Sequence, residues 1–233
     1  MTTKTLQPSD VQYQRYRAAI FDLDGTLLDS LHDIANAANA ALAAIGCPTH
    51  PIDDYRTLVG DGVRMLFQRA STECRENPEV LERCIQVYAD AYAATWNRES
   101  QPYPGIVDML TRLKRAGLRL AVLSNKPDAF TQQCVAHFFP EAQFEFVLGH
   151  SERFPRKPDP SSATYLVHCL GVEARSVAYV GDTNTDMQTA VGAKLSPIGV
   201  LWGFRSREEL VESGARDLVA TAEELAELLL QSE

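Results

Sequence analysis

Short apolar runs separated by helical patterns constrain the fold of this 233-residue chain more than any other feature. The runs cover residues 18–21, 118–123, 144–148, 177–180 and 198–201. Near-continuous apolar strands of this kind are typical of a parallel sheet that is buried on both faces. A helical pattern between two of the runs begins at Gly105 and stops at Gly117, as a helix with a C-terminal glycine does. The alternation predicts a doubly wound parallel-sheet α/β fold.

The spacing between the first two runs indicates an insertion. Between Asp22 and Leu118 lie 95 residues, too many for one crossover helix. Apolar residues between Ile34 and Ile45 follow a helical repeat, and two further helical segments follow at 54–70 and 78–96. We therefore expect an all-helical cap domain inserted into the α/β core.

The expected division of the chain has four parts. The cap occupies residues 31–100, and Pro102 and Pro104 mark the return to the core. The core takes residues 17–30 and 101–233 and ends in a short amphipathic helix at 222–230. Residues 1–16 are expected to be a loose N-terminal tail.

Composition excludes several classes of protein. The chain is 45% hydrophobic and 23% charged, which argues against disorder and low-complexity architectures. Its formal charge of −9 argues against a nucleic-acid or anionic-membrane partner. Five cysteines without a C-x-x-C pair indicate reduced thiols. With no apolar segment of membrane-spanning length and no signal-like start, we expect a cytoplasmic protein.

Paired carboxylates follow two of the predicted strands. Asp22 and Asp24 follow the first strand, and Asp182 and Asp186 follow the fourth. Ligands of open α/β sheets bind beyond the carboxyl ends of the strands, so four acids converging there would repel one another unless a hard cation lay among them. Mg²⁺ prefers such oxygen ligands. Taken singly, each pair is also compatible with a turn or a helix N-cap.

Two further segments suit an anionic ligand. Ser124, Asn125 and Lys126 follow the second strand, where a hydroxyl and backbone N–H groups can hold a phosphate oxygen. Lys157 lies in the sequence Arg-Lys-Pro-Asp-Pro, which suggests a rigid loop that presents a cation. Taken alone, Ser124 could equally well be a helix N-cap, and Lys157 could be a solvated surface residue.

Together the four motifs resemble those of the haloacid dehalogenase superfamily, which has a Rossmann-like core. The motifs are D-x-D-G-T, a serine, K-P and G-D-x-x-x-D, and they occur in this order over residues 17–233. The position of the insertion is similar to that of the helical-cap subclass. Residues 29–34 and 59–62 are similar to the phosphoglycolate phosphatase group.

The resemblance implies roles for the acids. Asp22 would be the nucleophile that forms an aspartyl-phosphate, and Asp24 would be the general acid and base. Mg²⁺ would be held by Asp22, the backbone carbonyl of Asp24 and Asp182. Asp186 would orient the metal shell or Lys157.

The resemblance also implies phosphate contacts and a reaction. Lys157 would be catalytic and would bind the phosphoryl group together with Ser124, Asn125 and Thr26. In the cap, Arg64 is the candidate for recognising a small carboxylated substrate. We expect a Mg²⁺-dependent phosphomonoester hydrolase, similar to phosphoglycolate phosphatase, that acts on a small phosphorylated metabolite as a monomer or homodimer.

Alternatives within the superfamily fit less well. Sugar-phosphate mutases of this group tend to carry a histidine where this chain has Ile34, and dehalogenases usually lack the carboxylate of Asp24. Phosphonate hydrolysis would need a Schiff-base lysine in the cap, yet residues 31–100 contain no lysine. A non-catalytic phosphometabolite-binding homologue is disfavoured because all four motifs are intact.

Overall fold

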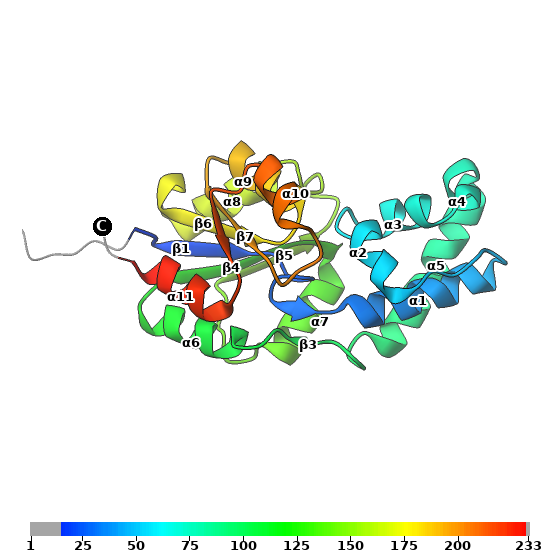
Figure 1. Cartoon of the computed structure of the whole chain (residues 1–233), viewed down its shortest axis with the longest axis horizontal. Coiled ribbons are helices and arrows are strands. Elements are labelled where there is room, and N and C mark those ends of the chain that lie inside the picture. Colours follow the sequence, from blue (N-terminus) through cyan, green and yellow to red (C-terminus); the bar gives the residue numbers. More distant parts are fainter. Residues whose placement is uncertain (1–14, 232–233) are drawn as a thin grey trace, which may run out of the picture.

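A parallel six-stranded sheet forms the centre of the computed structural model, which describes residues 15–231. Its order is β5-β4-β1-β6-β7-β8, and every neighbouring pair is parallel (Figure 1). The strands are β1 (Ala18–Phe21), β4 (Arg119–Pro127), β5 (Phe146–His150), β6 (Val177–Gly181), β7 (Ser196–Val200) and β8 (Asp217–Val219). The register places Phe21 beside Val122 and Val180, so β1 and β6 end at nearly the same level, whereas β4 continues beyond them to Pro127.

Helices cover both faces of the sheet, which confirms the doubly wound fold. On one face lie α6 (Ile106–Arg115), α7 (Asp128–Phe138) and α11 (Ala222–Leu230). The other face carries α8 (Ser161–Leu170), α9 (Asn184–Gly192) and α10 (Arg207–Glu212), with a 3-10 turn at Ala174–Ser176 before β6. Alternate β1 residues enter two separate cores: Ala18 and Ile20 one, Ala19 and Phe21 the other. Burial on both sides explains why the strands read as unbroken apolar runs.

The segment between β1 and β4 is helical, as expected. It holds α1 (Leu31–Ala44), a 3-10 turn (Ile52–Asp54), α2 (Tyr55–Leu58), α3 (Val63–Ala70), α4 (Thr72–Glu76) and α5 (Pro78–Thr95). This helical unit, residues 31–95, is called the cap below. Its two connections to the core pair as the short antiparallel strands β2 (Leu28–Asp29) and β3 (Gln101–Pro102). In Figure 1 the cap extends from one end of the core, beyond the carboxyl ends of the strands.

Local boundaries differ from the sequence expectations where backbone geometry decides them. The helix expected over 54–70 is broken at residues 59–62, because Gly60 and Gly62 adopt φ values of 113° and 85°. These angles lie in a region that glycine alone enters easily. The strands expected at 144–148 and 198–201 occupy 146–150 and 196–200, and the three-residue strand β8 was not expected. Short strands depend on their sheet partners for definition.

The expected tail lies mostly outside the described residues, and its last two residues are not loose. Tyr16 is fully buried, and the backbone N–H of Arg15 donates to the Gln231 carbonyl at 3.2 Å. These two residues therefore belong to the packed core.

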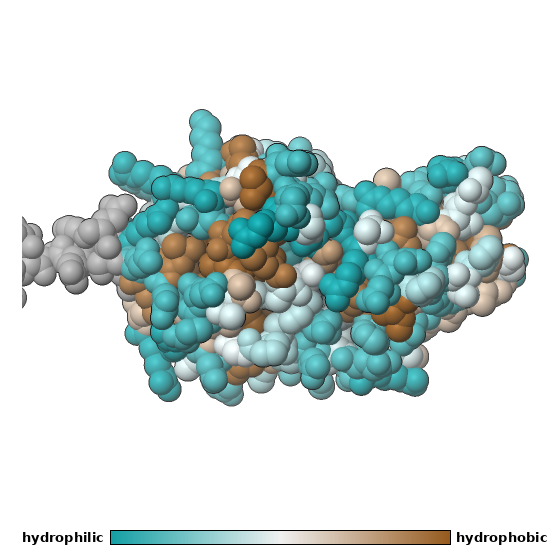
Figure 2. Space-filling model, viewed as in Figure 1, coloured by the Kyte–Doolittle hydropathy of each residue, from teal (hydrophilic) through white to brown (hydrophobic). Residues whose placement is uncertain are grey.

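The surface is mainly hydrophilic in the view that Figure 2 draws. The hydrophilic area covers both the core and the cap, with smaller apolar patches. None of the helices within residues 15–231 is both long enough and apolar enough to cross a membrane. All five cysteines are unpaired.

A buried carboxylate ties the start of the cap to the segment that returns from it to the core. Asp33, in the first turn of α1, is almost fully buried. Its oxygens accept hydrogen bonds from the backbone N–H groups of Glu99 at 3.1 Å and Ser100 at 2.9 Å, and from the Ser100 hydroxyl at 2.7 Å. The contact brings together residues more than 60 positions apart, at the junction between cap and core.

Replacing Asp33 by alanine should destabilise the protein. We expect the free energy of unfolding to fall by about 2–3 kcal/mol, because buried donors lose a charged acceptor. Urea denaturation measures this loss. The control is Asp90→Ala, which removes an exposed carboxylate that accepts a single bond from Gln86. Equal stability of the two variants would contradict the role given to Asp33.

Candidate active site

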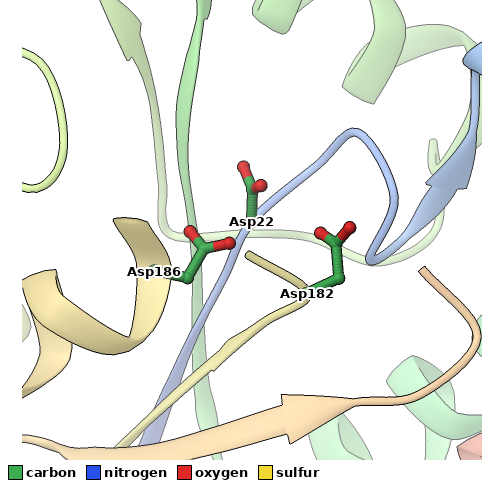
Figure 3. A group of neighbouring side chains, drawn as sticks. All are labelled: Asp22, Asp182 and Asp186. Carbon is green, nitrogen blue, oxygen red and sulfur yellow. The ribbon is translucent and has the colours of Figure 1, made fainter. Parts of the chain in front are cut away.

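Three aspartates meet at the carboxyl edge of the sheet. Asp22 follows β1, Asp182 follows β6, and Asp186 lies in the first turn of α9. Each offers a carboxylate oxygen, and these oxygens lie within 4.8 Å of one another (Figure 3). All three side chains are buried. The convergence follows from topology, because β1 and β6 are parallel neighbours and end at the same level.

Local hydrogen bonds fix two of these acids. The Thr183 hydroxyl and backbone N–H donate to Asp186 at 2.6 and 3.1 Å, in a capping box that starts α9. Asp182 accepts the Thr26 hydroxyl at 2.9 Å and the Phe204 backbone N–H at 2.8 Å. Each carboxylate is therefore held by donors from its own turn or from loops beside it.

A glycine permits the close approach to Asp182. Gly25 has φ of 87°, and a Cβ at this position would lie 2.3 Å from a carboxylate oxygen of Asp182. The glycine of the D-x-D-G-T motif is thus required both for the turn and for space. Any larger residue there would displace the acid.

A buried lysine joins the other two acids. The Lys157 Nζ lies 2.9 Å from Asp22 Oδ1 and 2.7 Å from Asp186 Oδ1. It also donates to the Leu123 carbonyl at 3.1 Å. Burial alone would lower the pKa of Lys157, but the carboxylates of Asp186 and Asp22 outweigh it and hold the pKa well above its usual value. Lys157 is therefore a permanent cation of the site.

One lysine does not balance three carboxylates. Burial, followed by the charge of Asp186, raises the pKa of Asp22 from its ordinary 3.8 to about 7, although Lys157 opposes the shift. Burial and the charges of Asp186 and Asp22 also raise the pKa of Asp182. Both acids thus favour a positive charge beside them. Such a donor set, three buried carboxylates and no thiol or imidazole, fits a hard divalent cation.

The side chain of Asp24 lies apart from the acid triad. It accepts two hydrogen bonds from the Lys126 Nζ, at 2.8 and 2.9 Å, and one from the Ser30 hydroxyl at 2.6 Å. It is therefore not in the group of carboxylates that could share a cation. Of the two groups of Asp24, only the backbone carbonyl is therefore left as a metal ligand, which is the metal-binding role that the resemblance implied.

Lys126 is the residue that sequence reasoning missed. It is 9% exposed, and its ammonium group lies 4.7 Å from the ring centre of Tyr92 on cap helix α5. Burial tends to lower the pKa of Lys126, but Asp24 holds it well above its usual value. The available signal was its place directly after Ser124 and Asn125, at the end of a central strand.

Two of the expected phosphate ligands have other hydrogen-bond partners. The Thr26 hydroxyl donates to Asp182. The Asn125 side chain donates to the carbonyls of Gly60 and Lys157 at 3.0 and 3.1 Å and accepts the Lys157 N–H at 2.9 Å. Both residues position other parts of the site, because their polar atoms are already used. Ser124 lines the pocket at the edge of the sheet.

The structure places Arg64 at the surface of the cap. The Arg64 guanidinium is 47% exposed and lies 2.5 Å from Glu82 on the neighbouring helix α5. It is not among the residues that line the pocket. The inward face of α3 is formed instead by its apolar residues Val63, Leu66 and Phe67.

A pocket separates the acidic edge from the cap. Its empty space, including the open mouth, is about 630 Å³. The polar part of its wall consists of core residues at the strand ends: Asp22, Asp24, Ser124, Asn125 and Lys126. Cap residues contribute Ile34, Val59, Gly60, Gly62, Val63, Leu66, Tyr88 and Tyr92, and the core adds Pro127, Phe130 and Phe204.

Comparison with known proteins identifies the family. Residues 19–200 match the family described as haloacid dehalogenase-like hydrolases. The chain belongs to this family. It is 30% identical over 225 residues to phosphoglycolate phosphatase 1 of Pseudomonas aeruginosa, which covers 92% of this chain and 82% of the relative. Phosphoglycolate phosphatase of Caulobacter vibrioides is 35% identical over 202 residues, covering 85% of this chain and 84% of that one.

A solved structure of a similar hydrolase supports the fold. The crystal structure of a Lactobacillus delbrueckii subsp. bulgaricus protein, provisionally described as a phosphoglycolate phosphatase, superposes with a TM-score of 0.87. It is 34% identical and covers 93% of this chain and 99% of its own. The haloacid dehalogenase-like core with a helical insertion is therefore confirmed.

The raised pKa of Asp22 predicts how stability depends on pH without a metal. Between about pH 4 and pH 7 the folded state binds the Asp22 proton more tightly than the unfolded state, so this group's contribution to stability falls as pH rises through that window. In EDTA, the melting temperature of the wild type should fall relative to that of Asp22→Asn as pH rises. Excess MgCl₂ should raise the wild-type melting temperature more at pH 8 than at pH 5.

The matched control for this measurement is Asp182→Asn. Because it removes one carboxylate of the triad, it should weaken or abolish the stabilisation by MgCl₂. A MgCl₂ effect that is unchanged in this variant would contradict a cation site at the triad.

Proposed function

We propose that this hydrolase is a Mg²⁺-dependent phosphomonoesterase that acts through an aspartyl-phosphate on Asp22. The observation that carries the proposal is the buried group of Asp22, Asp182 and Asp186, in which Lys157 contacts Asp22 and Asp186. Asp22 also lines a pocket together with Asp24. A carboxylate held next to a permanent cation and a second acid–base group is a suitable covalent nucleophile for phosphoryl transfer.

Metal binding is assigned to a subset of these groups. Asp22, Asp182 and the backbone carbonyl of Asp24 would hold Mg²⁺, and Asp186 would keep Lys157 in place through the 2.7 Å ion pair. When bound, Mg²⁺ reduces the repulsion between the Asp22 carboxylate and the phosphate dianion. The donor set and the raised pKa values of Asp22 and Asp182 support this assignment.

The chain's own groups supply the remaining chemistry. A carboxylate oxygen of Asp22 forms a bond to phosphorus while the bond from phosphorus to the alcohol oxygen breaks. Asp24 donates a proton to the departing oxygen and later accepts one from the water that hydrolyses the acyl phosphate. Lys157 and the Ser124 hydroxyl hold phosphoryl oxygens as their charge develops.

One position in the cap, Ile34, favours hydrolysis over transfer of the phosphoryl group back to the substrate. Ile34 is buried, lines the pocket and carries no group that could move a proton. Phosphoglycolate is the first substrate to test, since it is in the names of the relatives.

Asp22→Asn should remove activity while the protein stays folded. We expect p-nitrophenyl phosphate hydrolysis to fall by at least about 10³-fold, because the amide is a poor nucleophile. Phosphate release by the wild type should also stop in EDTA and return with MgCl₂. Full activity of the folded variant would refute the assignment of the nucleophile, and no release from any phosphomonoester would refute the enzyme.

Lys126→Met should separate positioning from substrate binding. Lys126 holds both carboxylate oxygens of Asp24, so its loss should lower kcat by about 10–100-fold and leave KM nearly unchanged, since a misplaced general acid loses part of its usual contribution of about 10²–10⁴-fold. The control is Lys114→Met, which alters a lysine on the surface of α6. A Lys126→Met enzyme with unchanged kcat would contradict this role.

A further inference from the structure

The pocket wall opposite the acidic edge is apolar and aromatic. Its buried members come from α1, α3 and α5 of the cap, from the break between α2 and α3, and from one core loop: Ile34, Val59, Leu66, Tyr88, Tyr92 and Phe204. If the phosphoryl group lies at Asp22, the alcohol part of the substrate lies against this wall.

Aromatic rings make up much of this wall. Tyr88 and Tyr92 are stacked with their ring centres 5.5 Å apart, and Phe130 meets Tyr92 edge-on at 5.1 Å. Such an array offers faces and edges to another apolar or aromatic group. The rings are fixed by one another, so little ordering is needed when a ligand binds.

Positive charge on the wall is already neutralised. Among the described residues that line the pocket, Lys126 is the one cation, and both of its short contacts are to Asp24. Arg64 lies against Glu82 outside the pocket. Arg156 approaches Gly62 but is exposed and lines a second, smaller cavity that adjoins the pocket at Ser124 and Asn125.

A carboxylate in this pocket would therefore be poorly placed. It would lose its hydration against largely apolar side chains, and the one lysine of the described pocket lining already donates to both oxygens of Asp24. Burying a charge without a partner is strongly unfavourable, whereas burying an apolar group is favourable in proportion to its area.

We infer that the preferred alcohol of this enzyme is uncharged and carries an apolar body of branched-alkyl or ring size, in preference to the carboxylate of glycolate. The inference rests on the proposed phosphomonoesterase function and specifies its substrate class. It assigns specificity to the inward positions of the cap, with Val63 at the start of α3 as the one most open to substitution, since it is half-buried and lines the pocket.

The first experiment compares substrates of matched shape on the wild-type enzyme with MgCl₂. Isobutyl phosphate has nearly the shape of 2-phosphoglycolate, with two methyl groups in place of the carboxylate oxygens, and benzyl phosphate extends the apolar body. We expect kcat/KM for isobutyl phosphate to exceed that for 2-phosphoglycolate by about tenfold or more, with benzyl phosphate at least as good as isobutyl phosphate.

The second experiment introduces a cation at the wall. Val63→Lys should raise the ratio of kcat/KM for 2-phosphoglycolate over isobutyl phosphate by about tenfold, because the new ammonium group can pair with the carboxylate. The matched control is Met65→Lys, two residues along the same helix, where the side chain is exposed and outside the pocket. The control should leave the ratio as in the wild type.

The outcomes separate the two proposals. Hydrolysis of 2-phosphoglycolate in preference to both uncharged esters would overturn the inference and leave the phosphomonoesterase intact. No hydrolysis of these esters or of p-nitrophenyl phosphate would overturn the proposed function itself. The wild-type comparison decides the inference even if Val63→Lys fails to fold.

Discussion

Excess negative charge at one buried edge of the sheet is the constraint on which the rest of the site depends. Three carboxylates lie together with one ammonium group, that of Lys157, which contacts two of them, so the fully ionised cluster carries two negative charges in excess. Buried charges persist only when they are paired or hydrogen-bonded. The hydroxyl groups of Thr26 and Thr183 and the Phe204 N–H meet this need on the protein side. A divalent cation would balance the two remaining negative charges. Such a cation can also bind a phosphate, so the cluster is suited to phosphate chemistry.

The loops that hold this cluster also hold the cap. Asn125 bonds both the Gly60 carbonyl in the cap and the backbone of Lys157. On the other side, Arg205 donates to the Val59 carbonyl at 2.7 Å, one residue beyond the Phe204 N–H that binds Asp182. The glycine-containing break between α2 and α3 is thus fastened to two core loops, each next to a charged group of the site. Any movement of the cap at this break would therefore shift the loops that hold Lys157 and Asp182.

Sequence reasoning located the charged centre because parallel topology alone brings it together. Asp22, Asp182 and Asp186 follow neighbouring strands, and a parallel sheet places such ends side by side. The hydrogen-bond partner of each polar side chain was not predictable in the same way. Whether the Thr26 hydroxyl faces a phosphate or Asp182 depends on a loop from a strand more than 150 residues away. The Lys126–Asp24 pair likewise joins two strand ends whose side-chain directions are set by the exit of each turn.

The outward position of Arg64 follows from the helical repeat of α3, which also explains why this part of the pocket wall is apolar. Helix α3 begins at Val63 after Gly62, and its apolar residues at positions 63, 66 and 67 repeat at helical spacing, so they turn inward together. Arg64 follows the first of them by one position and must therefore point away. The amphipathic pattern that stabilises the cap thus also places apolar side chains of α3 in the pocket wall. In a cap built this way, stability and substrate preference depend on the same inward positions, whereas the charged edge of the core can remain unchanged as the preferred alcohol changes.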